Sequence, residues 1–282
     1  MALCKSAQGA GVPRSGLVWN ALTMLVGGVL TGCSWGPVIF TPTDPLPPDQ
    51  ITHRLLDDVL SQSVSHGWVD YPRIQRDVRF GEYLAQLDRV DPTKLPSRDE
   101  QLAFWINAYN GFAIKGILDG LTPAPYLGWY RYFKGAHYNV GGQRLNLSEM
   151  EHEIIRKQFC EPRIHFAVVC ASASCPALQA TAYNGGHLDR QLDNAARMFI
   201  NDPGRNQFDR VRKVARLSKI FEWFEEDFIA DAGTVLGYVR RYVDNPELAR
   251  ELARIAYRVE YLDYDWSLNG TPPEEMSLAR RF

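Results

Sequence analysis

One short segment, residues 163–176, concentrates the side chains most able to do chemistry. It reads RIHFAVVCASASCP and places His165, Cys170 and Cys175 within eleven residues, together with two serines. A cysteine thiolate activated by a histidine is a common nucleophile in acyl transfer. Two cysteines this close in sequence also suit a small disulfide loop, if the backbone geometry allows it. The segment therefore predicts either a thiol-dependent site or a structural pair of cysteines.

The apolar residues inside this segment predict a buried strand from Arg163 to Cys170. Side chains alternate along a strand, so His165 and Cys170 would point to opposite faces. Cys170 would then need a histidine from elsewhere, such as His152 or His187, or the following loop would have to turn Cys175 back. The cysteine and histidine spacing matches no standard zinc pattern, so we expect no metal site and no cofactor.

Two side-chain amides stand out in an otherwise apolar helical stretch. Asn107 and Asn110 flank Tyr109 in the run FWINAYN, and residues three apart share one face of a helix. A buried amide without a partner costs about 1–3 kcal/mol, so both must be hydrogen-bonded. They either brace neighbouring loops or, with Tyr109, line a polar ligand pocket.

The elements that would position these residues are mostly helices. Periodicity and capping signals predict helices over residues 50–65, 80–87, 98–118, 148–158, 188–199 and 218–228, and another from Asn245-Pro246. The expected N-caps include Ser97, Ser148 and Ser218. A hairpin is expected over 137–147 around Gly141-Gly142, and strands over 163–170, 211–217 and 257–261. This order favours a single α+β domain with several helices packed on a small, mostly antiparallel sheet.

Composition allows a packed globular domain. The chain has 282 residues, of which 45% are hydrophobic, and its formal net charge is −2. The absence of a basic stripe argues against a nucleic-acid partner.

The N-terminal region has the residue pattern of a targeting signal. Lys5 and Arg14 precede an apolar run that ends in Leu30-Thr31-Gly32-Cys33, a pattern typical of secretory signal peptides. These four residues resemble the lipobox of bacterial lipoproteins, a resemblance that implies cleavage before Cys33 and acylation of its thiol, with palmitate as one acyl chain. We expect a signal peptide over 1–32 and a proline-rich tether over 33–49. Because Ser34 rather than aspartate follows the cysteine, the resemblance implies an outer-membrane anchor facing the periplasm.

The remaining motifs also carry a resemblance. The run FWINAYN, then Glu151-His152, then the segment from Arg163 to Pro176, and later LSKIFEW and YDWSLN, occur in the order found in domain-of-unknown-function family 547. The resemblance covers roughly residues 50–270, most strongly 97–200, and leaves 271–282 as a tail. It implies no particular activity.

Two functions are consistent with these residues. The first is an envelope lipoprotein, anchored in a membrane by its lipid, whose domain binds or assembles with an envelope protein or peptide. The second is a thiol-dependent hydrolase or acyl transferase of papain- or transglutaminase-like type. In the second, Cys170 is the first choice of nucleophile and His152 of base, with Cys175 and His165 as further catalytic candidates. The oxidising compartment that the lipobox implies makes a Cys170–Cys175 disulfide the default.

Overall fold

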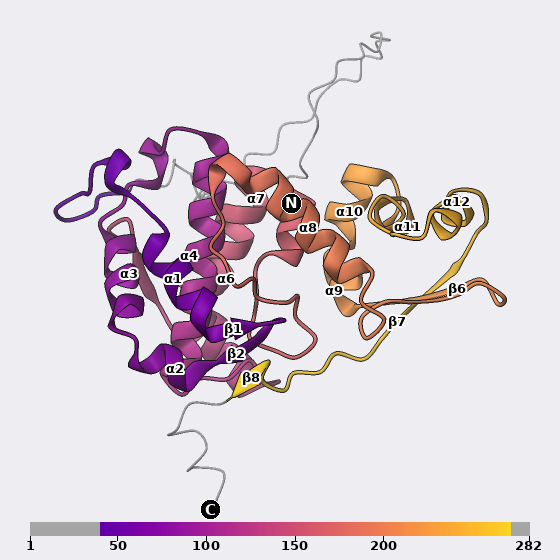
Figure 1. Cartoon of the computed structure of the whole chain (residues 1–282), viewed down its shortest axis with the longest axis horizontal. Helices are drawn as coiled ribbons and strands as arrows, with labels where there is room; N and C mark the ends of the chain where they lie inside the picture. The colour runs from indigo at the N-terminus through magenta and orange to yellow at the C-terminus, as the bar shows by residue number, and fades with distance from the viewer. Residues whose placement is uncertain (1–39, 272–282) are drawn as a thin grey trace, which may run out of the picture. The chain divides into compact units, whose positions relative to one another are not determined.

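Helices account for most of the residues that this computed structural model describes, 40–271 (Figure 1). The α-helices are α1 Arg54–Ser63, α2 Tyr71–Arg76, α3 Val78–Asp88, α4 Arg98–Leu118, α5 Leu127–Tyr130, α6 Leu147–Glu149, α7 Arg156–Phe159, α8 Leu188–Ile200, α9 Lys219–Trp223, α10 Glu225–Ala232, α11 Val235–Val239 and α12 Pro246–Arg254. Short 3₁₀ helices are η1 Pro48–Gln50, η2 Pro92–Lys94, η5 Pro162–Phe166 and η6 Gly185–His187, and π-helical turns are η3 Arg131–Gly135 and η4 Met150–Ile155. None of the described helices is long and apolar enough to cross a membrane.

The strands form three small sheets. They are β1 Val64–Ser65, β2 Trp68–Asp70, β3 Tyr138–Val140, β4 Gln143–Leu145, β5 Gln207–Asp209, β6 Val214–Leu217, β7 Arg258–Tyr261 and β8 Gly270–Thr271. Their orders are β1-β2-β8, β3-β4 and β5-β6-β7, with antiparallel pairs except for β2–β8 and β6–β7. The predicted α+β fold is confirmed, with the strands divided among three sheets.

Helix α4 is the centre of the larger hydrophobic core. The Ser97 side chain accepts a hydrogen bond from the backbone N–H of Glu100 and starts the helix at the predicted residue. Most α4 side chains are buried on every side, which explains why this helix lacks a polar face. A second core cluster gathers α8 to α11 around Phe221 and Phe228.

The segment 164–169 connects these two clusters. Ile164 packs in the cluster around α4, whereas Phe166 packs in the second cluster, stacked near Phe199 and Phe228. Both ends of the segment are therefore fixed by packing, and the cysteine loop that follows starts from a rigid base.

The strand predicted over 163–170 is wrong. The chain forms η5, Pro162–Phe166, followed by a turn. In place of a neighbouring strand, the side chain of Asn110 donates to the carbonyl of Ala167 at 2.9 Å and accepts from the N–H of Val169 at 2.8 Å. A side chain of α4 thus satisfies backbone groups that a sheet would otherwise pair.

Two helix boundaries also differ from expectation. The helix predicted to start at Ser148 is capped by Asn146, which forms a capping box with Glu149. The helix predicted from Ser218 to Phe228 is interrupted at Phe224, between α9 and α10. The hairpin prediction is confirmed, because Gly141 and Gly142 both adopt positive φ between β3 and β4.

The predicted signal peptide, Cys33, the first part of the proline-rich tether up to residue 39, and residues 272–282 of the C-terminal tail lie outside the described residues. Their assignment stays a prediction.

Candidate functional site

The cysteine segment folds into a small loop closed by a disulfide. Cys170 and Cys175 are bonded, with their Cα atoms 6.2 Å apart. The loop is also paired with residues 265–269: the N–H of Ala173 donates to the carbonyl of Ser267 at 2.7 Å, and the N–H of Asn269 donates to that of Ala171 at 3.0 Å. The predicted disulfide is therefore present, and backbone hydrogen bonds hold its loop independently of the sulfur atoms.

Arg205 fixes the other side of the same loop. Its guanidinium donates to the carbonyl of Cys175 at 3.1 and 2.7 Å, and to that of Ala173 at 3.0 Å. Asp202 pairs with the remaining nitrogen. The positive charge is thus compensated locally, and the arginine serves to shape the loop.

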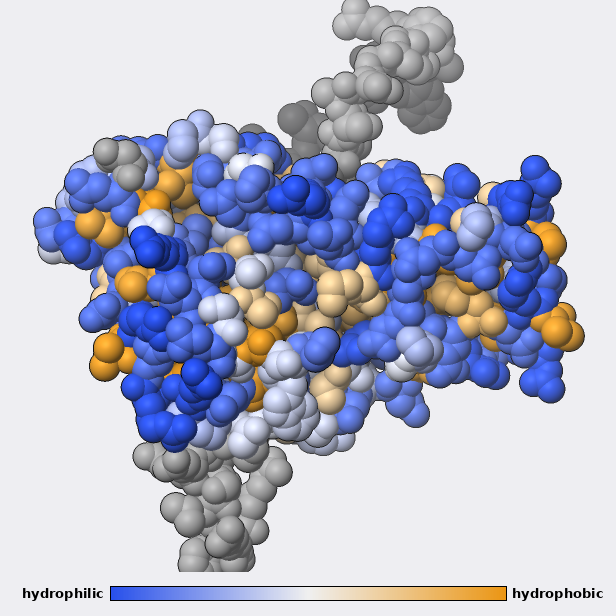
Figure 2. All heavy atoms as spheres, viewed as in Figure 1, coloured by the Kyte–Doolittle hydropathy of each residue, from blue (hydrophilic) through white to orange (hydrophobic). Residues whose placement is uncertain are grey.

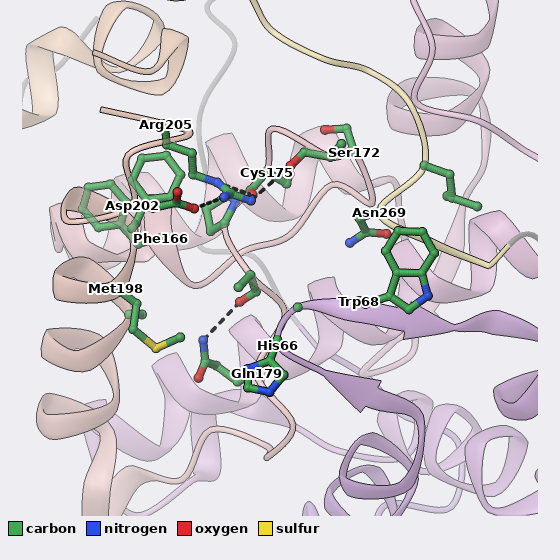
Figure 3. Close-up of a pocket in the computed structure, with 17 residues that line it drawn as sticks. His66, Trp68, Phe166, Ser172, Cys175, Gln179, Met198, Asp202, Arg205 and Asn269 are labelled. Atoms are coloured by element: carbon green, nitrogen blue, oxygen red, sulfur yellow. Dashed lines mark hydrogen bonds and ion pairs between the residues drawn. The ribbon is translucent and has the colours of Figure 1, made fainter. Parts of the chain in front are cut away.

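A cavity of about 320 Å³ lies against this loop (Figure 3). Met198 of α8 lies on one side of it, and His66 and Trp68 of the β1–β2 hairpin lie on another. Trp68 and Met198 are 57% and 54% exposed, unusually high for large apolar side chains. Figure 2 shows apolar residues gathered in the middle of this face, beside α8. The lining also includes Phe166, Phe199, Ser172, Gln179 and Asn269. An apolar wall with a few convergent polar groups is typical of a ligand-binding site.

Hydroxyl groups surround the disulfide sulfurs. The Tyr264 hydroxyl lies 2.9 Å from Ser172 Oγ, 3.3 Å from Cys170 Sγ and 3.4 Å from Cys175 Sγ. Burial raises the pKa of Tyr264 to about 12, so this hydroxyl keeps its proton at neutral pH. The ring packs against Trp223 and Trp266, with ring centroids 4.7 and 4.5 Å away, and these two tryptophans stack on each other.

The two candidate histidines belong to a separate ionic cluster. Arg156 donates two hydrogen bonds to Asp227 and a third to Nδ1 of His152 at 3.2 Å. Nε2 of His165 lies 2.7 Å from Asp227, and its ring stacks on Phe224. Burial lowers the pKa of His165, which is neutral and donates to the carboxylate. Burial opposes ionisation of Asp227, but the hydrogen bonds from His165 and Arg156 hold its pKa well below the usual value.

In the described part of the chain, no hydrogen bond joins this cluster to the cysteine loop. There, His165 Nδ1 is buried without a partner, and the hydrogen-bond partners of Cys170 Sγ are the hydroxyls of Ser172 and Tyr264. His187 lies exposed at the start of α8. Among the described residues, neither cysteine sulfur is hydrogen-bonded to a histidine, so no cysteine–histidine dyad is formed.

The two amides of α4 brace loops. Asn107 exchanges two hydrogen bonds with the backbone of Tyr183, at 2.8 and 2.9 Å, and Asn110 does the same with Ala167 and Val169. Tyr109 donates to the buried carboxylate of Glu151 at 3.1 Å. Of the two alternatives that the sequence allowed, the geometry corresponds to bracing, and none of the three lines the cavity of Figure 3.

Sequence reasoning missed the residues that shape the cavity. Trp68 is far in sequence from Met198 and Arg205, and the three residues have no motif in common. One local pattern could have indicated Trp68. Gly67 precedes this tryptophan, and a glycine before a short strand is consistent with a hairpin turn that leaves the following ring exposed.

Comparison with known families agrees with the resemblance noted above. Residues 92–200 match the model of a family described as "Protein of unknown function, DUF547". The matched part contains α4, the ionic cluster apart from Asp227, and the disulfide loop. No curated protein and no solved structure matches the chain. Within residues 40–271, no group of three or more His, Cys, Asp or Glu side chains is placed to hold a metal ion.

Proposed function

We propose that this chain is a lipid-anchored protein of the bacterial cell envelope whose domain binds an extended peptide segment of another envelope protein. The observation that carries the binding role is the cavity beside the disulfide loop, with Trp68 and Met198 exposed at its edge. Two large apolar side chains that face solvent across one cavity favour a ligand that brings its own apolar side chain.

The composition of the cavity supports a peptide as this ligand. Apolar walls come from Trp68, Met198 and Phe199. Gln179 Nε2 donates to the carbonyl of Ala177 and Asn269 Oδ1 accepts from Tyr71, so Gln179 Oε1 can accept from a ligand and Asn269 Nδ2 can donate to it. Such a combination suits an apolar side chain flanked by a peptide backbone. Because Asp202 compensates Arg205, a strongly charged ligand has no counterpart at this wall.

A peptide selection tests the binding role. Purified full-length protein is used to enrich short random peptides, and the enriched peptides are then titrated against variants. We expect them to share an apolar residue and to lose at least about tenfold in affinity for Trp68→Ala and Met198→Glu. The matched control is Val211→Glu, a 92% exposed position outside the cavity. No enrichment, or binding equal in all variants, contradicts the proposal.

A labelling experiment tests the anchor. Cells that express the chain are grown with radiolabelled palmitate and fractionated. Label is expected in the outer-membrane protein and absent from a Cys33→Ala variant. Retention of label in that variant, or its absence from both, overturns the lipid anchor.

The thiol-dependent hydrolase remains the alternative to test. It is less favoured because both sulfurs lie in a disulfide and the histidine cluster has no hydrogen bond to them. Rapid alkylation of reduced Cys170 together with turnover of an ester or amide substrate would favour it over the binding role.

A further inference from the structure

We propose that the Cys170–Cys175 disulfide exchanges with thiols, and that a dithiol peptide or protein is its reaction partner. This activity is distinct from peptide binding, although Ser172 and Cys175 of the loop also line the cavity. It depends on three features of the loop: unequal access to the two sulfurs, donors on the more buried one, and a backbone that stays in place when the disulfide opens.

The two cysteine residues differ in exposure. Cys170 is half-buried, whereas Cys175 is only 3% exposed. Exchange begins when a thiolate attacks one sulfur of the disulfide, and the attacked sulfur must be reached from solvent. Cys170 is therefore the point of attack, and Cys175 leaves.

The departing sulfur is already surrounded by donors. The backbone N–H of Cys170 donates to Cys175 Sγ at 2.8 Å, and the Tyr264 hydroxyl donates to it at 3.4 Å. Hydrogen bonds to a developing thiolate lower the barrier to its departure when they are in place beforehand. Ser172 Oγ, 3.0 Å from Cys170 Sγ, gives the attacked sulfur a further polar neighbour.

The chemistry balances with a dithiol as the reductant. A partner thiolate attacks Cys170 Sγ, a bond forms between these sulfurs, and the Cys170–Cys175 bond breaks with its electron pair going to Cys175 Sγ. The partner's second thiolate then attacks its own first sulfur, and Cys170 leaves. The partner is oxidised to a disulfide, Cys170 and Cys175 are reduced, and the two partner protons pass through solvent to these sulfurs.

The loop backbone should keep its conformation when the disulfide opens. Arg205 holds the carbonyls of Ala173 and Cys175, and backbone bonds join the loop to Ser267 and Asn269, none of which involves sulfur. Both thiols therefore stay close to each other after reduction, which allows the disulfide to form again. A disulfide that closes so short a loop adds less stability than one that closes a long loop.

Reduction of the folded protein tests the first step. Full-length protein is equilibrated with dithiothreitol or glutathione without denaturant, alkylated, and the peptide between Arg163 and Arg190 is weighed. We expect reduction within minutes and full recovery of the disulfide on return to oxidised glutathione. A disulfide that resists both reductants until the protein is unfolded overturns the proposal.

Single-cysteine variants test the direction of attack. With oxidised glutathione, Cys175→Ser should form a mixed disulfide at Cys170 at least about tenfold faster than Cys170→Ser forms one at Cys175. Melting curves verify that both variants fold, and peptide mapping separates these adducts from any at Cys160. Equal rates, or no adduct at Cys170, contradict the proposed direction.

A variant of Tyr264 tests the exchange without removing a cysteine. Tyr264→Phe keeps the ring packing but removes the donor, so reduction of the disulfide should slow by about threefold to tenfold. Tyr261→Phe, a neighbouring tyrosine whose hydroxyl has no contact with the loop in the described structure, should leave the rate unchanged. If Tyr264→Phe reacts at the wild-type rate, the hydroxyl has no part in exchange and this step fails. Peptide binding to the cavity is measured separately in the same variants, so the two proposals fail independently.

Discussion

The guanidinium of Arg205 donates two hydrogen bonds to the carbonyl oxygen of Cys175, at 3.1 and 2.7 Å. This contact crosses thirty positions of sequence and connects the turn after α8 to the disulfide loop. It gives the cavity one fixed wall, and it holds the loop in place without help from the sulfur atoms.

Replacing this arginine should weaken the fold and the cavity together. Arg205→Ala leaves two loop carbonyls without their charged donor, and we expect a loss of about 2–3 kcal/mol in unfolding free energy. Urea unfolding measures this loss. Arg212→Ala removes an arginine that is 77% exposed and serves as control, with an expected change below about 0.5 kcal/mol. Equal losses in the two variants would show that Arg205 has no special structural role.

Removing the side chain of Asn110 in α4 should lower the stability by a similar amount. Asn110→Ala leaves the Val169 N–H and the Ala167 carbonyl buried without partners, which should cost about 2–4 kcal/mol. Asn139→Ala, at an exposed position of β3, is the matched control. The measurement is again the free energy of unfolding in urea, and a near-neutral Asn110→Ala would contradict the bracing role.

Much of this arrangement follows from local sequence signals, and the rest does not. Ser97 and Asn245 cap their helices as predicted, because a cap needs only the side chain and the next two or three N–H groups. The strand predicted over the apolar run before Cys170 was wrong, because an apolar pattern alone does not distinguish a strand from another buried segment. Asn110, almost sixty residues away, supplies the pairing that keeps it out of a sheet. The cavity likewise arises from tertiary contacts between distant residues.

A side chain at position 67 should clash with a neighbouring residue as well as strain the backbone. Gly67 has φ of +80°, and an added Cβ would lie 2.7 Å from Cβ of Ala177 in the cavity lining. Gly67→Ala should therefore destabilise the protein and weaken peptide binding. Gly120→Ala shares the positive φ of +79° but meets no atom within 4 Å, so it isolates the backbone cost, about 1 kcal/mol. If thermal unfolding shows the same loss in both, the contact with Ala177 is unimportant.

Stability should fall on acidification from neutral pH. Burial lowers the pKa of His53 from 6.5 to about 4, and the pKa of His165 is lowered for the same reason. The unfolded chain binds protons at these sites near pH 6.5 whereas the folded chain does not, so acid favours unfolding. Each histidine should lower the free energy of unfolding by up to about 1.4 kcal/mol for each pH unit of acidification. For His53 this loss falls between pH 6.5 and about 4.

Urea unfolding at pH 7, 6 and 5 measures this slope. A His53→Gln variant should show a flatter dependence than the wild type, because the substituted side chain does not titrate. The pH-dependence is misassigned if wild type and variant have the same slope, or if wild-type stability is constant over this range.

The state of Cys170 and Cys175 in protein taken directly from the cell envelope tests the account most directly. Cells are quenched with an alkylating reagent, and the peptide between Arg163 and Arg190 is weighed before and after reduction. The account predicts a peptide lighter by two hydrogen atoms that accepts alkylation at both cysteines only after reduction. A peptide found only with both cysteines alkylated before reduction, and with none in the oxidised form, would contradict it, because the loop would then carry no disulfide in the cell.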